Sequence, residues 1–393
     1  MKILFLDWNS FCSNYIKSEF TQRGYELVLF DFPQSSEDTR GSETLAVRIA
    51  TAIMESNVDF VFSLNYFAVA AIAAKATKRK YISWTYDSPY IQLYSLTIEY
   101  PTNYAFVFDK SEYLNLKRKG VNTVYYLPMA GPADAYDDIL LSEKEHNAYD
   151  SDIAMIGSMY TESKHNLYRH FSLIDDYTKG YIEALMNAQK NIYGASVLER
   201  GLTPGIVEAL QKSCPMFERG DGMEDIEWVF ANYFLARHLT GIERQELIGE
   251  LAKNMPVTLY TPESTPELSN VDNRGSVDYY SEFAKVVKCT KVNLNISLRS
   301  IISGIPLRCF DIMAAGGFLL TTYQEDFMDY FEADKDYVFF ENKKDLVEKA
   351  RYYIEHDDIR NQIASNGYDK VKKYHNFKDR VDTMLSIAGI DII

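Results

Sequence analysis

Short apolar runs alternate with amphipathic segments through the first third of the chain. The apolar runs are rich in Val, Ile, Phe and Tyr, which predicts strands, and helical patterns separate them. The predicted strands are Ile3–Asp7, Glu26–Phe32, Phe60–Leu64, Tyr81–Tyr86, Ala105–Phe108 and Val124–Leu127. Alternation of this kind predicts a doubly wound parallel sheet, in which ligands bind beyond the carboxyl ends of the strands.

The same alternation returns after a polar stretch that reads as a linker, residues Met129–Ser151. A strand is predicted at Asp152–Ile156, and a helix-rich segment follows over about residues 165–254. The later predicted strands are Val257–Tyr260, Asn293–Ile296, Phe318–Thr321 and Tyr337–Phe340. The second half therefore reads as another parallel sheet that carries a helical insert.

We predict an α/β protein of two Rossmann-like domains that face a shared cleft, because 393 residues exceed the usual size of one core. The first domain covers residues 1–148, and the second covers residues 149–374 with its insert at about 165–254. The C-terminal helix, within residues 375–393, is predicted to pack back on the first domain.

The charge balance argues against several classes of partner. The chain has 41 Lys and Arg against 56 Asp and Glu, a net charge of −15, and no basic block. Because phosphate-rich partners need clustered cations, we expect no nucleic acid partner. The most apolar window, Val61–Ala74, is too short to span a bilayer, so no stable membrane insertion is expected. Four dispersed cysteines and the lack of a signal-peptide pattern favour a soluble, cytoplasmic protein.

The stretch Lys291–Thr322 concentrates polar residues at the ends of predicted elements. Pro306 suits the first turn of a short helix, and Gly316–Gly317 suits its end. The exposed amides of such a helix start attract anions, and Arg308 and Asp311 share one face near them. A cation for a phosphate beside a carboxylate for two hydroxyls fits a sugar nucleotide, and a surface ion pair is the alternative.

Four segments carry a further signal: SGIPLRCFDIMAAGGFLLT (303–321), WTYDSP (84–89), SDIAMIGSMY (151–160) and KYHNFKDRVDTML (373–385). Together they resemble the CgeB-like glycosyltransferases, a spore-maturation-associated group of GT-B enzymes. The resemblance implies the GT-B architecture and transfer of a sugar from a nucleoside-diphosphate donor. It also implies a ribose contact for Asp311, where related enzymes have Glu. Many retaining relatives carry a second Glu at the position of Gly304, so this chain departs from that pattern.

The candidate donor-binding residues lie at strand ends of the second domain. Arg308 is assigned to the diphosphate and would neutralise the leaving group as the glycosidic bond breaks. Main-chain groups near Gly275 would read the base, with Tyr279 or Tyr280 stacked on it; simple aromatic core packing is the alternative. The full set is Gly157, Ser158, Lys164, Gly275, Val277, Tyr279, Asn295, Ser297, Gly304, Arg308, Asp311, Gly316 and Gly317.

Asp87 is the candidate catalytic residue of the first domain, together with Arg308 of the second. It ends a predicted strand and precedes Ser-Pro, which places a carboxylate where a ligand of the sheet would lie. If transfer inverts the anomeric centre, Asp87 is the predicted general base; a turn aspartate that bonds its own backbone is the alternative. Asp7, Asn9 and Ser10, at the end of the first strand, are candidates for acceptor binding.

The sequence therefore predicts a glycosyltransferase that moves a sugar from a nucleoside-diphosphate sugar, such as a UDP-sugar, to a hydroxyl acceptor on a protein or glycan. No cofactor is expected. No D-x-D motif stands out as a metal site and the histidines show no metal-ligand spacing, so no metal is expected either. A non-catalytic nucleotide-sugar-binding or structural surface-layer protein and a nucleotide-sugar epimerase on the same fold stay open as alternatives. The sugar, the base, the stereochemistry and the oligomeric state stay open as well.

Overall fold

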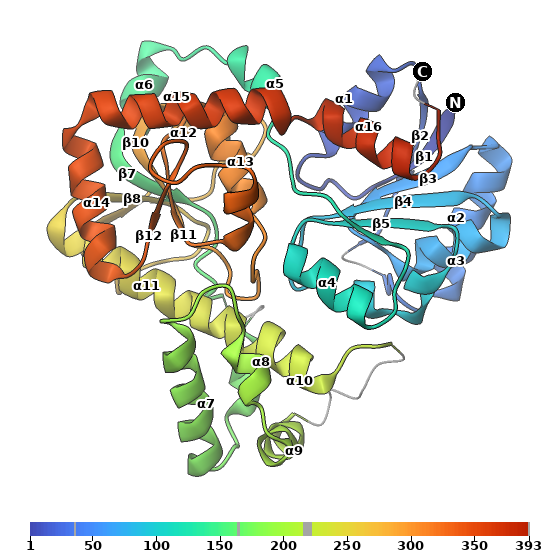
Figure 1. Ribbon diagram of the computed structural model, residues 1–393, viewed down its shortest axis with the longest axis horizontal. Coiled ribbons are helices and arrows are strands. Elements are labelled where there is room, and N and C mark those ends of the chain that lie inside the picture. The colour runs from blue at the N-terminus through green and yellow to red at the C-terminus, as the bar shows by residue number, and fades with distance from the viewer. Residues whose placement is uncertain (35–36, 163–165, 215–221, 392–393) are drawn as a thin grey trace. The chain divides into compact units, whose positions relative to one another are not determined.

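The computed structural model describes residues 1–34, 37–162, 166–214 and 222–391 (Figure 1). The chain divides into two compact units. The first comprises Met1–Ala130, Arg219–Glu224 and His375–Ile393, and the second comprises Gly131–Glu218 and Asp225–Tyr374. Each unit has its own six-stranded sheet, which confirms the predicted α/β class.

The first unit is built on a sheet in which every pairing is parallel. Its strands are β1 (Lys2–Asp7), β2 (Glu26–Asp31), β3 (Phe60–Leu64), β4 (Lys80–Thr85), β5 (Asn103–Val107) and β6 (Val124–Tyr126), in the order β2-β1-β3-β4-β5-β6. The helices are α1 (Ser13–Gln22), α2 (Glu43–Ser56), α3 (Ala68–Thr77), α4 (Lys110–Arg118) and α16 (Phe377–Ile387). Short 3-10 turns at Ile91–Tyr94 and Leu96–Glu99 join β4 to β5. All six predicted strands are confirmed.

The C-terminal helix α16 belongs to the first unit. Asp382 on α16 pairs with Arg23 at 2.8 Å, next to the end of α1. Lys80, at the start of β4, donates to the carbonyl oxygen of Ala388 at 2.6 Å. These contacts fix the last helix against residues that come early in the chain.

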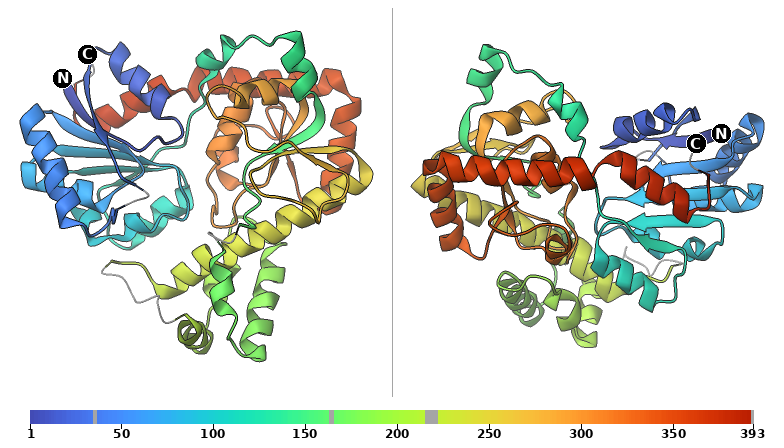
Figure 2. Two further views of the ribbon diagram at one scale, coloured as in Figure 1. Left: turned by 180° about the vertical axis from the view of Figure 1, so that it is seen from behind. Right: turned by 45° about the horizontal axis from the view of Figure 1, so that its top comes forward.

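The second unit has the strand order β12-β11-β10-β7-β8-β9, again all parallel. Its strands are β7 (Ser151–Ile156), β8 (Val257–Tyr260), β9 (Val271–Asn273), β10 (Thr290–Asn295), β11 (Leu319–Thr322) and β12 (Val338–Phe340). The order makes β7 and β10 neighbours at the centre of the sheet, and the chain proceeds outward from both. In parallel sheets this is the switch point, beside which ligands bind at the carboxyl ends of the strands. Figure 2 shows this sheet from two further sides.

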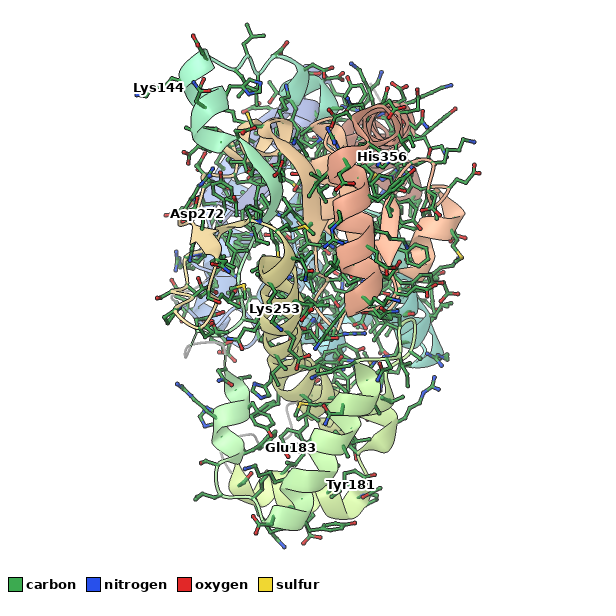
Figure 3. The ribbon with its side chains drawn as sticks, turned by 90° about the vertical axis from the view of Figure 1, so that its left-hand side faces the viewer. Lys144, Tyr181, Glu183, Lys253, Asp272 and His356 are labelled. Atoms are coloured by element: carbon green, nitrogen blue, oxygen red, sulfur yellow. The ribbon has the colours of Figure 1, made fainter. Side chains whose placement is uncertain are left out.

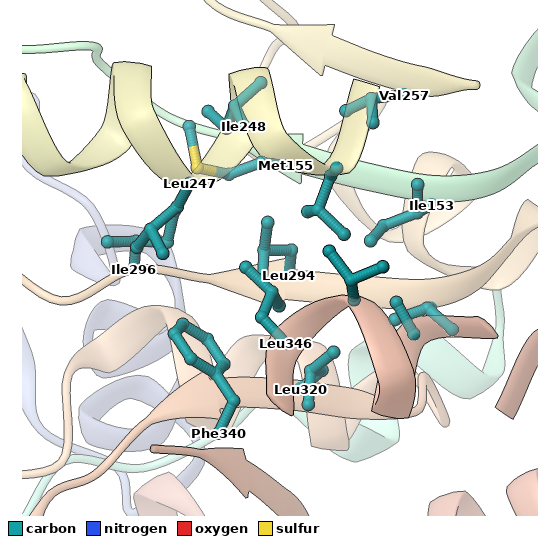
Figure 4. Packing of buried hydrophobic residues seen from close by; sticks show 14 of the residues in the cluster. Ile153, Met155, Leu247, Ile248, Val257, Leu294, Ile296, Leu320, Phe340 and Leu346 are labelled. Carbon is teal, nitrogen blue, oxygen red and sulfur yellow. The ribbon is translucent and has the colours of Figure 1, made fainter. Parts of the chain in front are cut away.

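The main core of the second unit is formed by alternate apolar residues of its strands, which lie on one face of the sheet and are covered by helices (Figure 4). The helices of this unit beyond the insert are α5 (Ala133–Asp137), α6 (Glu143–Tyr149), α11 (Arg237–Asn254), α12 (Phe283–Cys289), α13 (Leu307–Ala314), α14 (Lys343–Glu355) and α15 (Asp357–Tyr374), with a 3-10 turn at Glu325–Asp329. Leu247 and Ile248 of α11 and Leu346 of α14 pack against the strand residues. None of the helices in the described ranges is long and apolar enough to cross a membrane.

The helical insert is shorter than predicted. Its described elements are a 3-10 turn (Leu167–Phe171), α7 (Asp176–Gln189), α8 (Val197–Gly201), α9 (Pro204–Ser213), α10 (Ile226–Val229) and a π-helical stretch (Phe230–Ala236). Figure 3 shows Tyr181 and Glu183 on α7. Helix α11, which was assigned to the insert, is the crossover helix between β7 and β8 and packs in the sheet core. The insert is anchored by Arg299, which donates to the carbonyl oxygens of Lys190 at 2.9 Å and Ile192 at 3.1 Å.

The boundary between the units lies at Ala130–Gly131 instead of the predicted residues 148–149. The polar stretch after Gly131 forms the short helices α5 and α6, which are bound to the second unit. Lys288 donates to the carbonyl oxygen of Tyr136 at 2.6 Å, and Lys285 pairs with Glu145 at 2.6 Å. Polar composition alone does not distinguish a linker from a solvated helix whose charges are paired.

Gly131 gives a testable prediction about stability. A Cβ atom there would lie 2.6 Å from the Cβ of Ala314 and 2.7 Å from the carbonyl oxygen of Phe310. We expect Gly131→Ala to lower the free energy of unfolding by about 2 kcal/mol, because α13 would have to shift. The matched control is Gly180→Ala on α7, where nothing lies within 4 Å; a gain of about 0.5–1 kcal/mol is expected there. Urea unfolding of both variants tests this, and an unchanged Gly131→Ala protein would contradict it.

Candidate functional site

Arg244 of α11 lies at the switch point of the second sheet. Its guanidinium donates to the carbonyl oxygen of Ser158, just beyond β7, and to that of Ile296, just beyond β10. The guanidinium also lies over the ring of Tyr160, 4.8 Å from its centroid. The side chain is 8% exposed. A buried cation therefore joins the carboxyl ends of the two central strands.

A second cation, Arg308, lies near Arg244. Burial lowers the pKa of the Arg244 guanidinium, and the nearby charge of Arg308 lowers that pKa further, while Glu263 and Glu162 act in the opposite direction. Within the described part of the chain, no salt bridge to a carboxylate is found for either arginine. Two like charges at one edge of the sheet repel each other, so an anion bound between them would be stabilised.

Helix α13 carries Arg308 and Asp311 on one face, as predicted. Arg308 lies over the ring of Phe283, with its guanidinium carbon 4.5 Å from the ring centroid. The predicted alternative, a surface ion pair, does not describe Asp311, because this residue is only 1% exposed. Burial raises the pKa of Asp311, and the charge of Arg308 opposes this rise, so the cation still acts on the carboxyl group.

Asp311 is held by one side chain and has one oxygen without a partner. The Tyr279 hydroxyl donates to Oδ1 at 3.0 Å, and Oδ2 has no hydrogen-bond partner among the described residues. Burial raises the pKa of this carboxyl to about 7, against the lowering effects of Arg308 and of the Tyr279 hydrogen bond. A buried polar atom without a partner costs about 1–3 kcal/mol. Two hydroxyl groups of a ligand would supply the missing donors.

Gly157 and Ser158, predicted to hold phosphate, are engaged within the unit. The Gly157 amide donates to the carbonyl oxygen of Tyr260 at 3.0 Å, and its φ of 147° favours glycine. The Ser158 hydroxyl bonds to the carboxylates of Glu263 and Glu162. Burial and the neighbouring Glu263 raise the pKa of Glu162. Ser158 therefore contributes to the site through the carbonyl oxygen that Arg244 holds. Lys164 lies outside the described residues.

Asn295 and Ser297 connect the ends of β10 and β11. The side-chain amide of Asn295 donates to the Ser297 hydroxyl at 3.1 Å and to Thr321 Oγ1 at 2.9 Å. The main-chain amide of Ser297 donates to Thr322 Oγ1 at 3.1 Å. Both predicted residues are buried. Ser297 also lines a small pocket with Tyr193, Gly194, Arg299, Thr322 and Gln324. Gly304 is buried in the loop before α13.

The remaining predicted glycines lie in turns whose backbone conformation and hydrogen bonds account for them. Gly275 has a φ of 79° and donates its amide to Asn273 Oδ1 at 3.0 Å, and the nearby Val277 packs against a buried apolar cluster. Gly316 and Gly317 end α13: their amides donate to Met313 and Ile312 carbonyls at 3.0 Å. They lie at the opposite end of the helix from Arg308. The structure thus brings together Arg308, Asp311 and Tyr279, and does not bring Gly316 and Gly317 to them.

In the first unit, Asp87 is exposed and anchored at the end of β4. Its Oδ2 accepts from the Asn65 amide at 2.7 Å, and Asn65 Oδ1 accepts from the main-chain amide of Tyr86 at 3.1 Å. Asn65 directly follows β3 and has a φ of 62°. A small pocket here is lined by Thr85, Asp87, Ser88, Tyr90, Leu93, Val107, Phe108, Asp109 and Glu112. The carboxylate is therefore oriented by a neighbouring strand end, which suits a general base.

Asp7 is bound by its own neighbours at the end of β1. It pairs with Lys17 at 2.9 Å and accepts from the Ser13 hydroxyl at 3.1 Å and from the Asn9 amide at 3.4 Å. Burial favours the neutral acid, but Lys17 and these hydrogen bonds hold the pKa of Asp7 below its ordinary value. Ser10 is buried, and its carbonyl oxygen accepts from Ser13 at 3.3 Å.

Aromatic side chains surround these polar groups, and the sequence patterns did not single them out. Trp8 stacks on Tyr86 with 6.1 Å between centroids, and Phe11 lies 6.4 Å from Tyr86. Phe11 is 47% exposed. An exposed aromatic ring therefore lies beside the polar groups at this edge of the sheet. Across the described ranges, no group of three or more His, Cys, Asp or Glu side chains that could hold a metal ion is found.

Residues 237–386 match the family model described as glycosyl transferase-like. The match begins at the first residue of α11 and contains Arg244, Arg308 and Asp311, and the insert precedes it. No curated protein matches the chain.

Several solved structures share the fold over almost the whole chain. HepE of Anabaena in complex with UDP-glucose is 11% identical, with a TM-score of 0.54, over 98% of this chain and 100% of that one. Sucrose-phosphate synthase of Thermosynechococcus elongatus is 10% identical, with a TM-score of 0.54, over 98% of each chain. BGT of phage T4 in complex with its UDP-glucose substrate is 12% identical, with a TM-score of 0.50, over 99% of each chain. The chain has the GT-B fold, and its matched segment indicates a glycosyltransferase.

Proposed function

We propose that this chain transfers a sugar from a nucleoside-diphosphate sugar to a hydroxyl group of a protein or glycan acceptor, without a metal ion. The observation that carries the proposal is the cluster of Arg244, Arg308 and Asp311 at the switch point of the second sheet. Two guanidinium groups suit a diphosphate, and a carboxylate with an unpaired oxygen suits the ribose hydroxyls. All three residues lie in the segment that matches the family model.

The same cluster suits the charge that develops during transfer. The acceptor oxygen bonds to the anomeric carbon while the bond from that carbon to the diphosphate breaks, and the departing diphosphate gains negative charge. Arg244 and Arg308 would offset this charge without reorganisation, because both guanidinium groups are already held in place. The acceptor proton would pass to the Asp87 carboxylate, which implies inversion of the anomeric centre.

UDP-sugars are the first donors to test, because HepE and the T4 phage enzyme were both solved with UDP-glucose. Within the family we assign the chain to the CgeB-like group on the four segments quoted above. We assign it to the cytoplasm because its four cysteines are free and buried.

The binding test compares UDP-, GDP-, dTDP- and CDP-sugars by calorimetry. We expect one nucleotide class to bind saturably, and Arg308→Ala and Asp311→Ala each to weaken it by about tenfold or more, since each removes a contact to a charged or buried group. Lys253→Ala is the control, because Lys253 lies on α11 and is 71% exposed.

Full binding by both variants would contradict the assigned site. Binding by the wild-type protein without turnover of the donor would favour the non-catalytic alternative. Release of an altered sugar nucleotide would favour the epimerase.

A further inference from the structure

We propose that Tyr279 is a positioning residue: its hydroxyl fixes the Asp311 carboxyl so that the second oxygen is presented to the ribose of the donor. The inference rests on the proposed function and adds a residue that acts through Asp311. It replaces the sequence-based expectation that Tyr279 stacks on the base.

The geometry gives Tyr279 a defined place. Its hydroxyl donates to Asp311 Oδ1 at 3.0 Å, and the tyrosine is only 8% exposed. The ring of Tyr279 contacts Tyr280, with centroids 5.0 Å apart, and Phe283, with centroids 6.1 Å apart. Phe283 also contacts Arg308. Phe283 therefore contacts both Tyr279, which orients the carboxyl of Asp311, and Arg308, which is assigned to the diphosphate.

The unpaired, buried oxygen Oδ2 of Asp311 is the observation that points to a ligand. Asp311 is 1% exposed, and its Oδ2 has no hydrogen-bond partner in the described chain. Since Oδ1 is occupied by Tyr279, the carboxyl cannot rotate to exchange its two oxygens without breaking that bond. A vicinal diol, such as that of ribose, can donate two hydrogen bonds to the remaining lone pairs, whereas a phosphate group can donate only where it is itself protonated.

The arrangement predicts how binding depends on pH. The titratable groups that act on Asp311 are Arg308 and Cys309 on its own helix and Tyr279 from the loop after β9. Burial raises the pKa of Asp311 to about 7, and the tyrosine hydrogen bond lowers it. Below this pKa the carboxyl is neutral and must itself donate a hydrogen, so it accepts fewer ribose hydroxyls. Nucleotide affinity should therefore fall as the pH decreases through about 7.

The test measures binding of UDP and of pyrophosphate to the intact chain between about pH 5.5 and 8.5. Pyrophosphate lacks ribose but titrates in the same range, so its profile separates the ionisation of the phosphates from that of Asp311. Tyr279→Phe keeps the ring and removes only the hydroxyl. We expect its UDP profile to shift to higher pH and its affinity at pH 7 to fall about five- to tenfold, with pyrophosphate binding unchanged.

Two further variants complete the design. Asp311→Asn should lose the ribose-dependent pH response, because its amide does not titrate. Tyr368→Phe is the matched control, since Tyr368 also donates to a carboxylate, that of Asp137 at 2.8 Å. A Tyr279→Phe binding profile identical to that of the wild type would overturn this inference and leave the proposed function in place. A loss of pyrophosphate binding as large as the loss of UDP binding would do the same. Failure of the wild-type protein to bind UDP or any other nucleoside diphosphate would overturn the proposed function as well.

Discussion

Replacing Arg244 with Leu is expected to weaken binding of a nucleoside diphosphate by about a hundredfold, which corresponds to about 2.7 kcal/mol. Removal of a buried charge that contacts an opposite charge costs about 2–5 kcal/mol. The expected loss exceeds that of Arg308→Ala, because Arg244 is more deeply buried and its guanidinium is already oriented by two carbonyl groups. Calorimetry with UDP and with pyrophosphate should show the same loss, since both ligands carry the diphosphate.

Arg244→Leu also leaves the carbonyl oxygens of Ser158 and Ile296 without their donor, so we expect it to lower stability by about 2 kcal/mol. Arg244→Lys separates charge from geometry: it keeps the cation but lacks the fork that reaches both carbonyl groups. Lys253→Ala, on the same helix, should change neither property. A folded Arg244→Leu protein that binds UDP like the wild type would show that the buried arginine is purely structural.

Asp87→Asn is expected to lower kcat by about 10²- to 10⁴-fold, the usual contribution of a general base. The affinity of the Asp87→Asn protein for the donor should stay within about twofold of the wild-type affinity, because Asp87 has no assigned contact with the nucleotide. The change preserves the size of the side chain and removes its capacity to take a proton. The measurement is the rate of sugar release from the donor, with an acceptor or with water.

Asp31→Asn provides the matched control, since Asp31 is also an exposed aspartate at the end of a strand in the same sheet. It should leave turnover unchanged. The anomeric configuration of the product, determined by NMR, tests the mechanism independently, because a base at Asp87 requires inversion. A retained configuration, or a kcat for Asp87→Asn near that of the wild type, would place the chemistry on other residues.

Strand positions could be read from the sequence because buried parallel strands are nearly continuous apolar runs. The sheet of the first unit follows the predicted strands closely. Strand β9 is different: it is only three residues long, Val271–Asn273, and none of them is buried. The length of the insert was overestimated because α11 has only a weak apolar periodicity and buries the charged residues Glu243 and Arg244, so its sequence does not reveal that it packs on the sheet.

The candidate site was partly accessible to the same reasoning. Arg308 and Asp311 are three residues apart on one helix, so local periodicity places them together. Arg244 has no such neighbour in sequence. Its partners, Ser158 and Ile296, come together only because β7 and β10 are adjacent, and strand order is a property of the whole domain. A lone arginine in a helical pattern is indistinguishable from a solvated one until that order is known.

The residues that flank the insert on its two sides lie close together. A Cβ atom on Gly241, in the second turn of α11, would be 3.0 Å from the carbonyl oxygen of Tyr160, just after β7. Closing a flexible connection between neighbouring points costs only about 0.6 kcal/mol for each doubling of its length. A module inserted at this position therefore adds only a small loop-closure cost to the folding of the second unit. This makes the β7–α11 junction a natural place for new recognition elements to be added, by evolution or by grafting.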